Sequence, residues 1–191
     1  MLLRRALPLI VSPAREWEAV AAEDLPPARV FLGYVVPLSA VPAVGWMLGL
    51  AIFGADLGFR DEGVTPLALG AILYAGAVTL AGSVLSVLAL AAAFFLVAPM
   101  YEVSRHWGRA LNVAAYGTTP LWVAGCLLVK PGLVILGPLA FLHCCHLYYS
   151  GLQRVAGVKR GDAAEYVAIS LFLVTVASLV VGGIIGSLAL I

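Results

Sequence analysis

The chain has 191 residues, of which 63% are hydrophobic and 11% charged, and its formal net charge is +1 at pH 7. This composition is far more apolar than that of a soluble domain and indicates an integral membrane protein. A net charge this close to zero gives no electrostatic basis for binding nucleic acid or a strongly anionic partner.

The N-terminal segment, 1–29, predicts a short helix on the cytoplasmic side of the membrane. Its opening run MLLRRALPLIV lacks a small-residue cleavage site, so we expect it to be retained. Ser12–Pro13 is typical of a helix start and Pro26–Pro27 of a stop. An interfacial helix with the indole of Trp17 at the headgroup level fits this segment, and an ordinary solvated helix fits it equally well.

The membrane domain, 30–191, contains stretches without any charged residue that are each long enough to cross a bilayer, which takes about 20 residues. These windows are 30–55, 63–101, 110–129, 131–153 and 166–191. Their apolar residues are continuous rather than alternating, which disfavours barrel strands. The sequence therefore predicts an all-α fold, a polytopic membrane bundle of five transmembrane helices with a short N-terminal interfacial helix.

The second window, 63–101, fits either one long helix or two short spans joined near Gly82. The distribution of basic residues favours one helix. With five spans and a cytoplasmic N-terminus, nine basic residues lie inside and two, Arg60 and Lys130, lie outside; a sixth span would change this split to five and six. The nine are Arg4, Arg5, Arg15, Arg29, Arg105, Arg109, Arg154, Lys159 and Arg160. We therefore predict a cytoplasmic N-terminus and a C-terminus on the outer side.

The ends of the later spans carry short turn and capping signals. The third and fourth spans are joined by LVKPGL, so they are predicted to be antiparallel neighbours with Pro131 and Gly132 at the turn. The fifth span opens at Asp162 with Glu165 three residues later, an acidic variant of the capping box.

Prolines and small residues inside the spans predict local breaks and close packing. Pro37, Pro42 and Pro120 leave backbone carbonyls without partners, so kinks are expected there. The segment Tyr116–Pro120 is the densest in polar groups, and its hydroxyls suit either a hinge or a small polar binding spot. The small residues Gly45, Gly49, Ser178, Gly182 and Gly186 are expected to pack within the chain rather than to form a dimer seam.

Aromatic residues near the predicted span ends are interpreted as anchors at the membrane interface. They are Tyr34, Tyr101, Trp107, Tyr148 and Tyr149.

The stretch FLHCCHLYYSGL, 141–152, is the one candidate for metal chemistry. On a helix His143 and His146 share a face, whereas Cys144 and Cys145 turn away, and no acidic residue is available at that depth. We therefore interpret the histidines as neutral and hydrogen-bonded inside the bundle, with His143 and His146 as weak metal candidates. The spans contain no carboxylate pair or nucleophile turn, so no catalytic residue and no cofactor is predicted.

Four ordered segments resemble the Yip domain family, the five-span membrane proteins named for interaction with Ypt/Rab GTPases. They are SPAREWEAVAAE, GYVVPLSAVPAVG, ALNVAAYGTTPLWVAG and LYYSGLQRVAGV. The resemblance implies a compact five-helix bundle without catalysis or cofactor, and the use of arginine over lysine is similar to the bacterial branch. It points to Tyr116, Pro120, Tyr149, Gly151 and Leu152 as interaction candidates, and His143 to His146 is not part of the family pattern.

Taken together, the sequence predicts a non-enzymatic scaffold or regulator in the bacterial inner (plasma) membrane. Its expected partners are the lipid bilayer and other membrane proteins or a second copy of the chain. An alternative is a small transporter or channel component with a polar cavity near His143, His146 and Tyr116–Pro120, and a third is a metal-dependent membrane enzyme. Trp17 and Pro37 are further structural and interaction candidates, in addition to Tyr116, Pro120, Tyr149, Gly151 and Leu152.

Overall fold

The computed structural model describes residues 2–23, 25–54 and 66–188, and in this part of the chain all regular secondary structure is helical. The α-helices are α1 (Ala6–Val11), α2 (Pro13–Ala22), α3 (Pro27–Val30), α4 (Val36–Phe53), α5 (Leu69–Val97), α6 (Trp107–Gly117), α7 (Thr119–Ala124), α8 (Gly137–Gly151) and α9 (Ala163–Leu188). The short 3₁₀ segments are η1 (Leu2–Arg5), η3 (Ala98–Tyr101), η4 (Gly125–Val129) and η5 (Pro131–Leu136), and the π-helical turns are η2 (Phe31–Val35) and η6 (Leu152–Ala156).

These elements join into five helical stretches that are long and apolar enough to cross a membrane, which confirms the predicted all-α, five-span fold. The stretches are Pro27–Phe53, Leu69–Tyr101, Trp107–Val129, Gly132–Ala156 and Ala163–Gly182. Most of these helical stretches begin and end within a few residues of the charge-free windows. A helix does not stop where the first charge appears, and Arg29 and Arg109 belong to the first turns of their spans.

The second span is one uninterrupted helix. α5 runs from Leu69 to Val97 through Gly82, so the described part of the predicted window 63–101 contains no break, and residues 63–65 lie outside the described part. A single glycine in an α-helix costs only about 1 kcal/mol relative to alanine, which the hydrogen bonds of a long apolar helix easily override.

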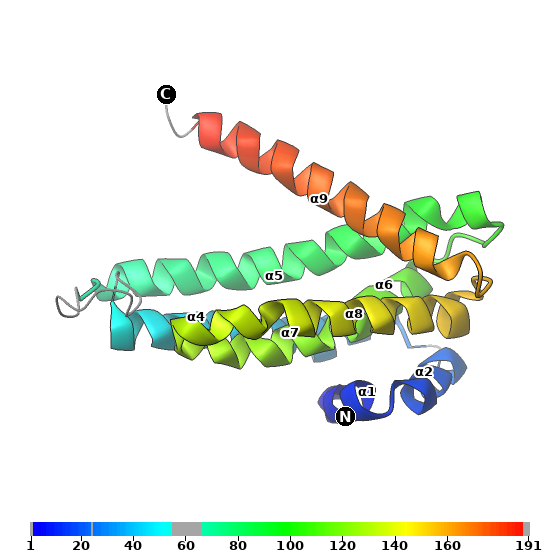
Figure 1. Cartoon of the computed structure of the whole chain (residues 1–191), viewed down its shortest axis with the longest axis horizontal. Coiled ribbons are helices and arrows are strands. Elements are labelled where there is room, and N and C mark those ends of the chain that lie inside the picture. The colour runs from blue at the N-terminus through cyan, green and yellow to red at the C-terminus, as the bar shows by residue number, and fades with distance from the viewer. Residues whose placement is uncertain (1, 24, 55–65, 189–191) are drawn as a thin grey trace.

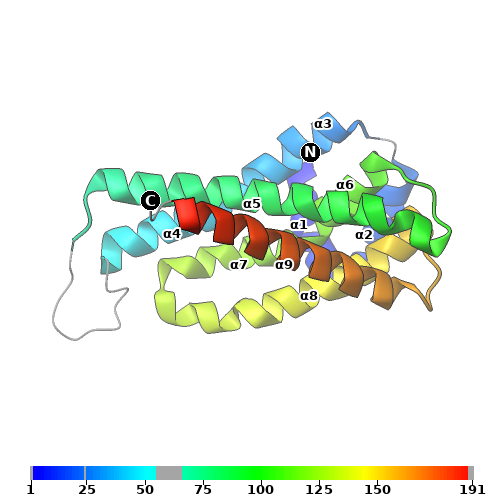
Figure 2. The same ribbon diagram turned by 90° about the horizontal axis from the view of Figure 1, so that it is seen from above.

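The membrane helices lie side by side along one axis, except α9 (Figures 1 and 2). The third and fourth spans are antiparallel neighbours, as predicted. The turn is at Lys130 rather than at Pro131 and Gly132, which begin the 3₁₀ segment η5. α9 contacts α5 and α8 and then diverges from them toward the C-terminus (Figure 1). The outward side chains of α9 are apolar; Phe172 and Leu179, for example, are 67% and 71% exposed. They present a surface for lipid or for another apolar helix.

The N-terminal helices α1 and α2 pack against the bundle and are not free at its surface. α1 contacts α6 and α7, and α2 contacts α8 and η6, so both lie alongside one end of the molecule (Figure 1). Leu9 and Trp17 are fully buried in these contacts. The expectation of a Trp17 indole in the lipid headgroups is therefore wrong. α2 does begin at Pro13, although the Ser12 side chain makes no capping hydrogen bond.

Each proline expected to break a span occupies a different kind of site. Pro37 lies at the start of α4, directly after the π-helical turn Phe31–Val35, and Pro42 lies inside α4. Pro120 lies at the start of α7, where α6 has ended at Gly117. The kink predicted at Pro120 therefore coincides with a break between two helices, and a proline in a first helical turn needs no N–H donor.

Two glycines of α4 allow a close contact with the segment η4. A Cβ at Gly45 would collide with the carbonyl of Gly125, and one at Gly49 with the carbonyl of Leu128, so α4 touches η4 backbone to backbone. This is the intramolecular packing expected for Gly45 and Gly49. On α9, by contrast, Ser178 is exposed and Gly182 has no neighbour within 4 Å of its Cβ position.

Candidate functional site

The core beside the N-terminal helices contains an aromatic cluster, which we define as Trp17, Tyr34, Tyr116 and Trp122. The ring centroids of Tyr34 and Tyr116 are 4.5 Å apart, those of Trp17 and Tyr116 are 6.4 Å apart, and those of Tyr34 and Trp122 are 6.3 Å apart. All of these rings are buried, with Tyr116 only 1% exposed. Edge-on aromatic contacts of this kind add about 0.5–1.5 kcal/mol per pair beyond area burial. The cluster joins α2, the π turn before α4, α6 and α7 into one core.

Two threonines close the break between α6 and α7. The Thr118 hydroxyl donates to the Ala114 carbonyl at 2.7 Å, and the Thr119 hydroxyl donates to the Tyr116 carbonyl at 2.6 Å. Since each threonine proton is used in this way, the phenols of Tyr148 and Tyr34 donate to Thr118 and Thr119, at 2.8 Å and 2.6 Å. The hydroxyls predicted near Pro120 thus bond carbonyls of the broken helix, and neighbouring helices hold them in place.

Tyr148 connects this network to the far side of the bundle. Its ring lies where a Cβ of Gly117 would be, and it packs edge-on against Phe94 of α5 at 5.7 Å. Tyr166 of α9 donates its hydroxyl to the Phe94 carbonyl. One continuous set of contacts therefore runs from the N-terminal helices through α6 and α8 to α5 and α9.

Most of the interaction candidates are brought together here, but Pro37 is not. Trp17, Tyr116, Pro120, Gly151 and Leu152 are all buried around the cluster. Gly151 matters for its missing side chain, because a Cβ there would lie 2.8 Å from the indole ring of Trp17. Tyr149 is half-buried, and its carbonyl accepts a hydrogen bond from Gln153 at 3.0 Å.

Pro37 faces outward from α4. It lines an open apolar groove together with Val41, Val44, Gly45, Leu48, Cys126 and Val129. Its place is therefore on the outer surface of the first span, away from the aromatic cluster.

Tyr34 and Tyr148 are central residues that the interpretation as interface anchors missed. Both are buried, at 0% and 4% exposed, so the anchor assignment is wrong for them, whereas Trp107 is 39% exposed. A signal for their burial was present in the sequence. Tyr34 lies five residues into its charge-free window and Tyr148 six from the end of its own, deeper than a ring at the headgroup level.

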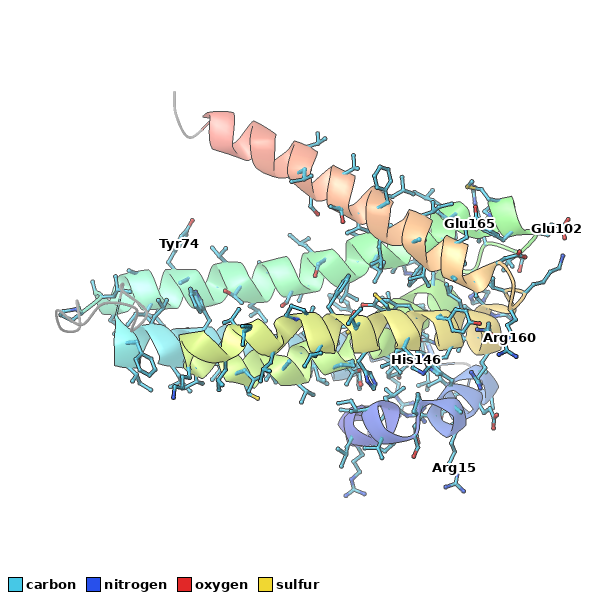
Figure 3. All side chains as sticks on the ribbon, in the orientation of Figure 1. Arg15, Tyr74, Glu102, His146, Arg160 and Glu165 are labelled. Atoms are coloured by element: carbon cyan, nitrogen blue, oxygen red, sulfur yellow. The ribbon has the colours of Figure 1, made fainter. Side chains whose placement is uncertain are left out.

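The two histidines do not form a closed site. Their rings lie 6.3 Å apart on α8, and among the described residues no group of three His, Cys, Asp or Glu side chains is placed to hold a metal ion. His146 is exposed (Figure 3), so the expectation that both histidines are hydrogen-bonded inside the bundle is wrong. The Nε2 atom of His143 is buried without a hydrogen-bond partner among the described residues.

Two ion pairs join segments at the end of the bundle that carries the N-terminal helices. Arg5 pairs with Glu23, which ties the start of the chain to the end of α2. Lys159 donates to Glu102 at 2.9 Å, between the α8–α9 and α5–α6 connections. This hydrogen bond holds the pKa of Glu102 below its ordinary value and raises that of Lys159.

Fold and site together define a multi-span helical membrane protein whose buried polar groups mostly bond to its own backbone and side chains. A sequence model of the Yip1 domain matches residues 8–182. The chain belongs to the Yip1 domain family, whose members are membrane proteins not known as enzymes. Neither the curated proteins nor the solved structures contain a match to it.

Proposed function

We propose that this protein is a non-enzymatic scaffold or regulator of other membrane proteins in a bacterial inner membrane. The observation that carries the proposal is that four hydroxyls around the α6–α7 break bond within the protein, whereas the Tyr116 hydroxyl is buried without a partner among the described residues. Thr118, Thr119, Tyr34 and Tyr148 all use their hydroxyls on one another or on the backbone, so the core serves architecture. Surfaces available to partners include the outward apolar side chains of α5 and α9 and the charged outer face of α2.

The proposed orientation has residues 1–29 on the cytoplasmic side. In support, the α5–α6 and α8–α9 connections carry Arg105, Arg154, Lys159 and Arg160, and the first turn of α6 carries Arg109, all at one end of the bundle. Lys130 lies in the hairpin at the other end. Figure 3 places Glu102 and Arg160 at that first end and Tyr74 near the opposite one. Basic residues concentrate on the cytoplasmic side of membrane proteins.

Site-specific cross-linking in living cells tests the scaffold proposal. A photoreactive amino acid at Leu179 of α9 or at Tyr74 of α5, both more than two-thirds exposed at 71% and 72%, is expected to capture a membrane protein or a second copy. The matched control is the same reagent at Val113, which is fully buried and should react only within the chain. Capture of lipid alone at both exposed positions, at native expression level, would count against a scaffold.

A second candidate, a small transporter or channel component, is favoured by one cavity. It has a volume of about 280 Å³, and its lining includes Pro42 of α4, Ser83 and Ser86 of α5, Thr118 of the α6–α7 turn and Trp122 of α7. His143 and His146 do not line it. Flux measured in liposomes, with the wild type compared with Thr118→Val and with the His143→Ala, His146→Ala pair, tests this function. Leakage equal to that of empty vesicles in all three preparations removes it.

A further inference from the structure

A polar opening of the described part of the molecule lies between α2, the residues that follow it and the start of α6. This cavity has a volume of about 520 Å³, within the range of about 300–1,000 Å³ that small-molecule sites occupy. Its lining includes Glu23, Pro27, His106, Arg109, Asn112 and Val155. We call it the α2–α6 cavity.

The α2–α6 cavity lies at the membrane–water boundary. Pro27, Gly108 and Val155 line it, and each lies within one residue of the end of a membrane-spanning stretch: Pro27–Phe53, Trp107–Val129 and Gly132–Ala156, respectively. Three span ends at one opening place it at the level of the lipid headgroups.

Asn112 supplies an acceptor that the protein itself leaves unused. The residue is only 7% exposed, and its Oδ1 atom is buried with no hydrogen-bond partner in the described part of the chain. A buried polar atom without a partner costs about 1–3 kcal/mol, so such atoms are normally paired with protein, water or ligand. Asn112 lines the cavity, so a ligand that enters it lies beside this residue.

The opposite side of the same cavity favours a negative charge. Arg109 lines it beside the first turn of α6, whose N-terminal amides have no partners within the helix. The Nδ1 atom of His106 accepts from the Arg109 amide at 3.3 Å, leaving the N–H groups of Trp107 and Gly108 for other acceptors. Glu23 is already paired with Arg5, so its charge is largely compensated. A guanidinium beside a helix N-terminus is a typical phosphate site.

We propose that the α2–α6 cavity binds a phosphodiester headgroup that also carries a hydrogen-bond donor. The phosphate lies against Arg109 and the first turn of α6, and an ammonium or hydroxyl group of the head donates to Oδ1 of Asn112. Ethanolamine and glycerol heads have such donors. A choline head has neither N–H nor O–H and would leave Asn112 unpaired. The site therefore selects ethanolamine or glycerol phospholipids over choline phospholipids.

The test uses the full chain in nanodiscs that contain equal amounts of ethanolamine, glycerol and choline phospholipids with identical acyl chains. Lipids retained after release from the disc are counted by native mass spectrometry. For the wild type we expect ethanolamine or glycerol lipid to exceed choline lipid by about tenfold, the effect of one hydrogen bond. Asn112→Leu should reduce this preference to about one, and Arg109→Gln should lower retention of all three lipids.

Arg160→Gln is the matched control, because Arg160 is an exposed arginine that does not line the cavity. The proposal is overturned if the wild type retains choline lipid as well as ethanolamine and glycerol lipid. It is also overturned if the Arg109→Gln and Arg160→Gln chains retain the same amount of lipid. Arg109 is exposed, so its variant remains informative if Asn112→Leu fails to fold.

A second arm separates a membrane lipid from a soluble ligand with the same chemistry. Glycerophosphoethanolamine is titrated into the chain in discs of choline lipid alone. Binding that Arg109→Gln abolishes identifies a soluble phosphodiester as sufficient, whereas binding only of the complete lipid in the first arm identifies the membrane as its source. Binding in neither arm refutes the site.

Discussion

At the scale of single residues, the position of the N-terminal helices depends on Gly151, which has no side chain. A Cβ at Gly151 would lie 2.8 Å from Cζ2 of Trp17, closer than carbon atoms approach one another. Gly151→Ala is therefore expected to displace Trp17 and to destabilise the fold by about 1–3 kcal/mol, the usual cost of overpacking a core. Thermal unfolding in detergent measures the change.

The same helix offers a control for the glycine substitution. Gly137, at the start of α8, has no atom within 4 Å of its Cβ position, so Gly137→Ala should be neutral or slightly stabilising. If both variants unfold at the same temperature, helix propensity rather than contact with Trp17 governs α8.

The hydroxyl of Thr118 is expected to contribute more to the free energy of unfolding than the hydroxyl of Tyr148. Thr118→Val keeps the shape of the side chain but leaves the phenol proton of Tyr148 buried without an acceptor, at a cost of about 1–3 kcal/mol. Tyr148→Phe removes the donor and leaves Thr118 bonded to the Ala114 carbonyl, so it should cost less.

A double-mutant cycle with thermal unfolding checks the Thr118–Tyr148 contact. Once Tyr148→Phe is present, adding Thr118→Val should cost clearly less than it does alone, because the orphaned phenol is gone. Thr118→Ser keeps the hydroxyl and serves as the control. Strictly additive effects would show that the two groups do not interact.

At the scale of elements, α2 is expected to be protected as part of the folded core. Trp17→Ala should release α2 while leaving α6 and α8 intact, because Trp17 is the largest side chain that this helix buries. Hydrogen exchange of the α2 amides measures the release. Glu18→Ala changes an exposed residue of the same helix and should leave the exchange slow. If the α2 amides of the wild type exchange as fast as those of Trp17→Ala, α2 is not docked on the bundle.

The Glu102–Lys159 pair links two connections and predicts a pH dependence. Since the pKa of Glu102 is lowered, its contribution to stability is present above the ordinary pKa of glutamate and is lost as pH falls through the lowered value. The difference in unfolding temperature between wild type and Glu102→Gln should therefore be small at neutral pH and disappear in acid. Both partners are exposed, so a large difference would be unexpected.

The sequence predicted the spans better than the docking of the segment before them, and the reason is physical. Crossing a bilayer needs only length and the absence of charge, which 63–101 shows directly, and α5 is a single helix in its described part. Burial of Trp17 depends on Gly151, far along the chain and on another helix. No local pattern around Trp17 contains that information, whereas its exposed neighbours Arg15 and Glu18 resemble a solvated helix.

At the scale of the whole molecule, the bundle has a packed end and an open end. The end with the N-terminal helices contains the aromatic cluster and the ion pairs, while α9 separates from α5 and α8 toward the other end (Figure 1). In a bilayer, apolar surface gains nothing from packing on another helix rather than on lipid unless shapes fit closely. The exposed apolar face of α9, which includes Phe172 and Leu179, is therefore stable as it stands, and it is accessible to a neighbouring protein.

An odd number of spans predicts that the two termini lie on opposite sides of the membrane. The described part of the chain has five spanning stretches, and the basic residues at the α5–α6 and α8–α9 connections favour retention of that end in the cytoplasm. Epitope tags before Met1, after Gly161 and after Ile191 of the full chain test this orientation. In intact spheroplasts only the tag after Ile191 should be accessible to protease, and all three should be cleaved once the membrane is permeabilised. Equal protection of the first and last tags would require an even number of spans, and because α5 has no break to supply another one, it would contradict the five-span fold itself.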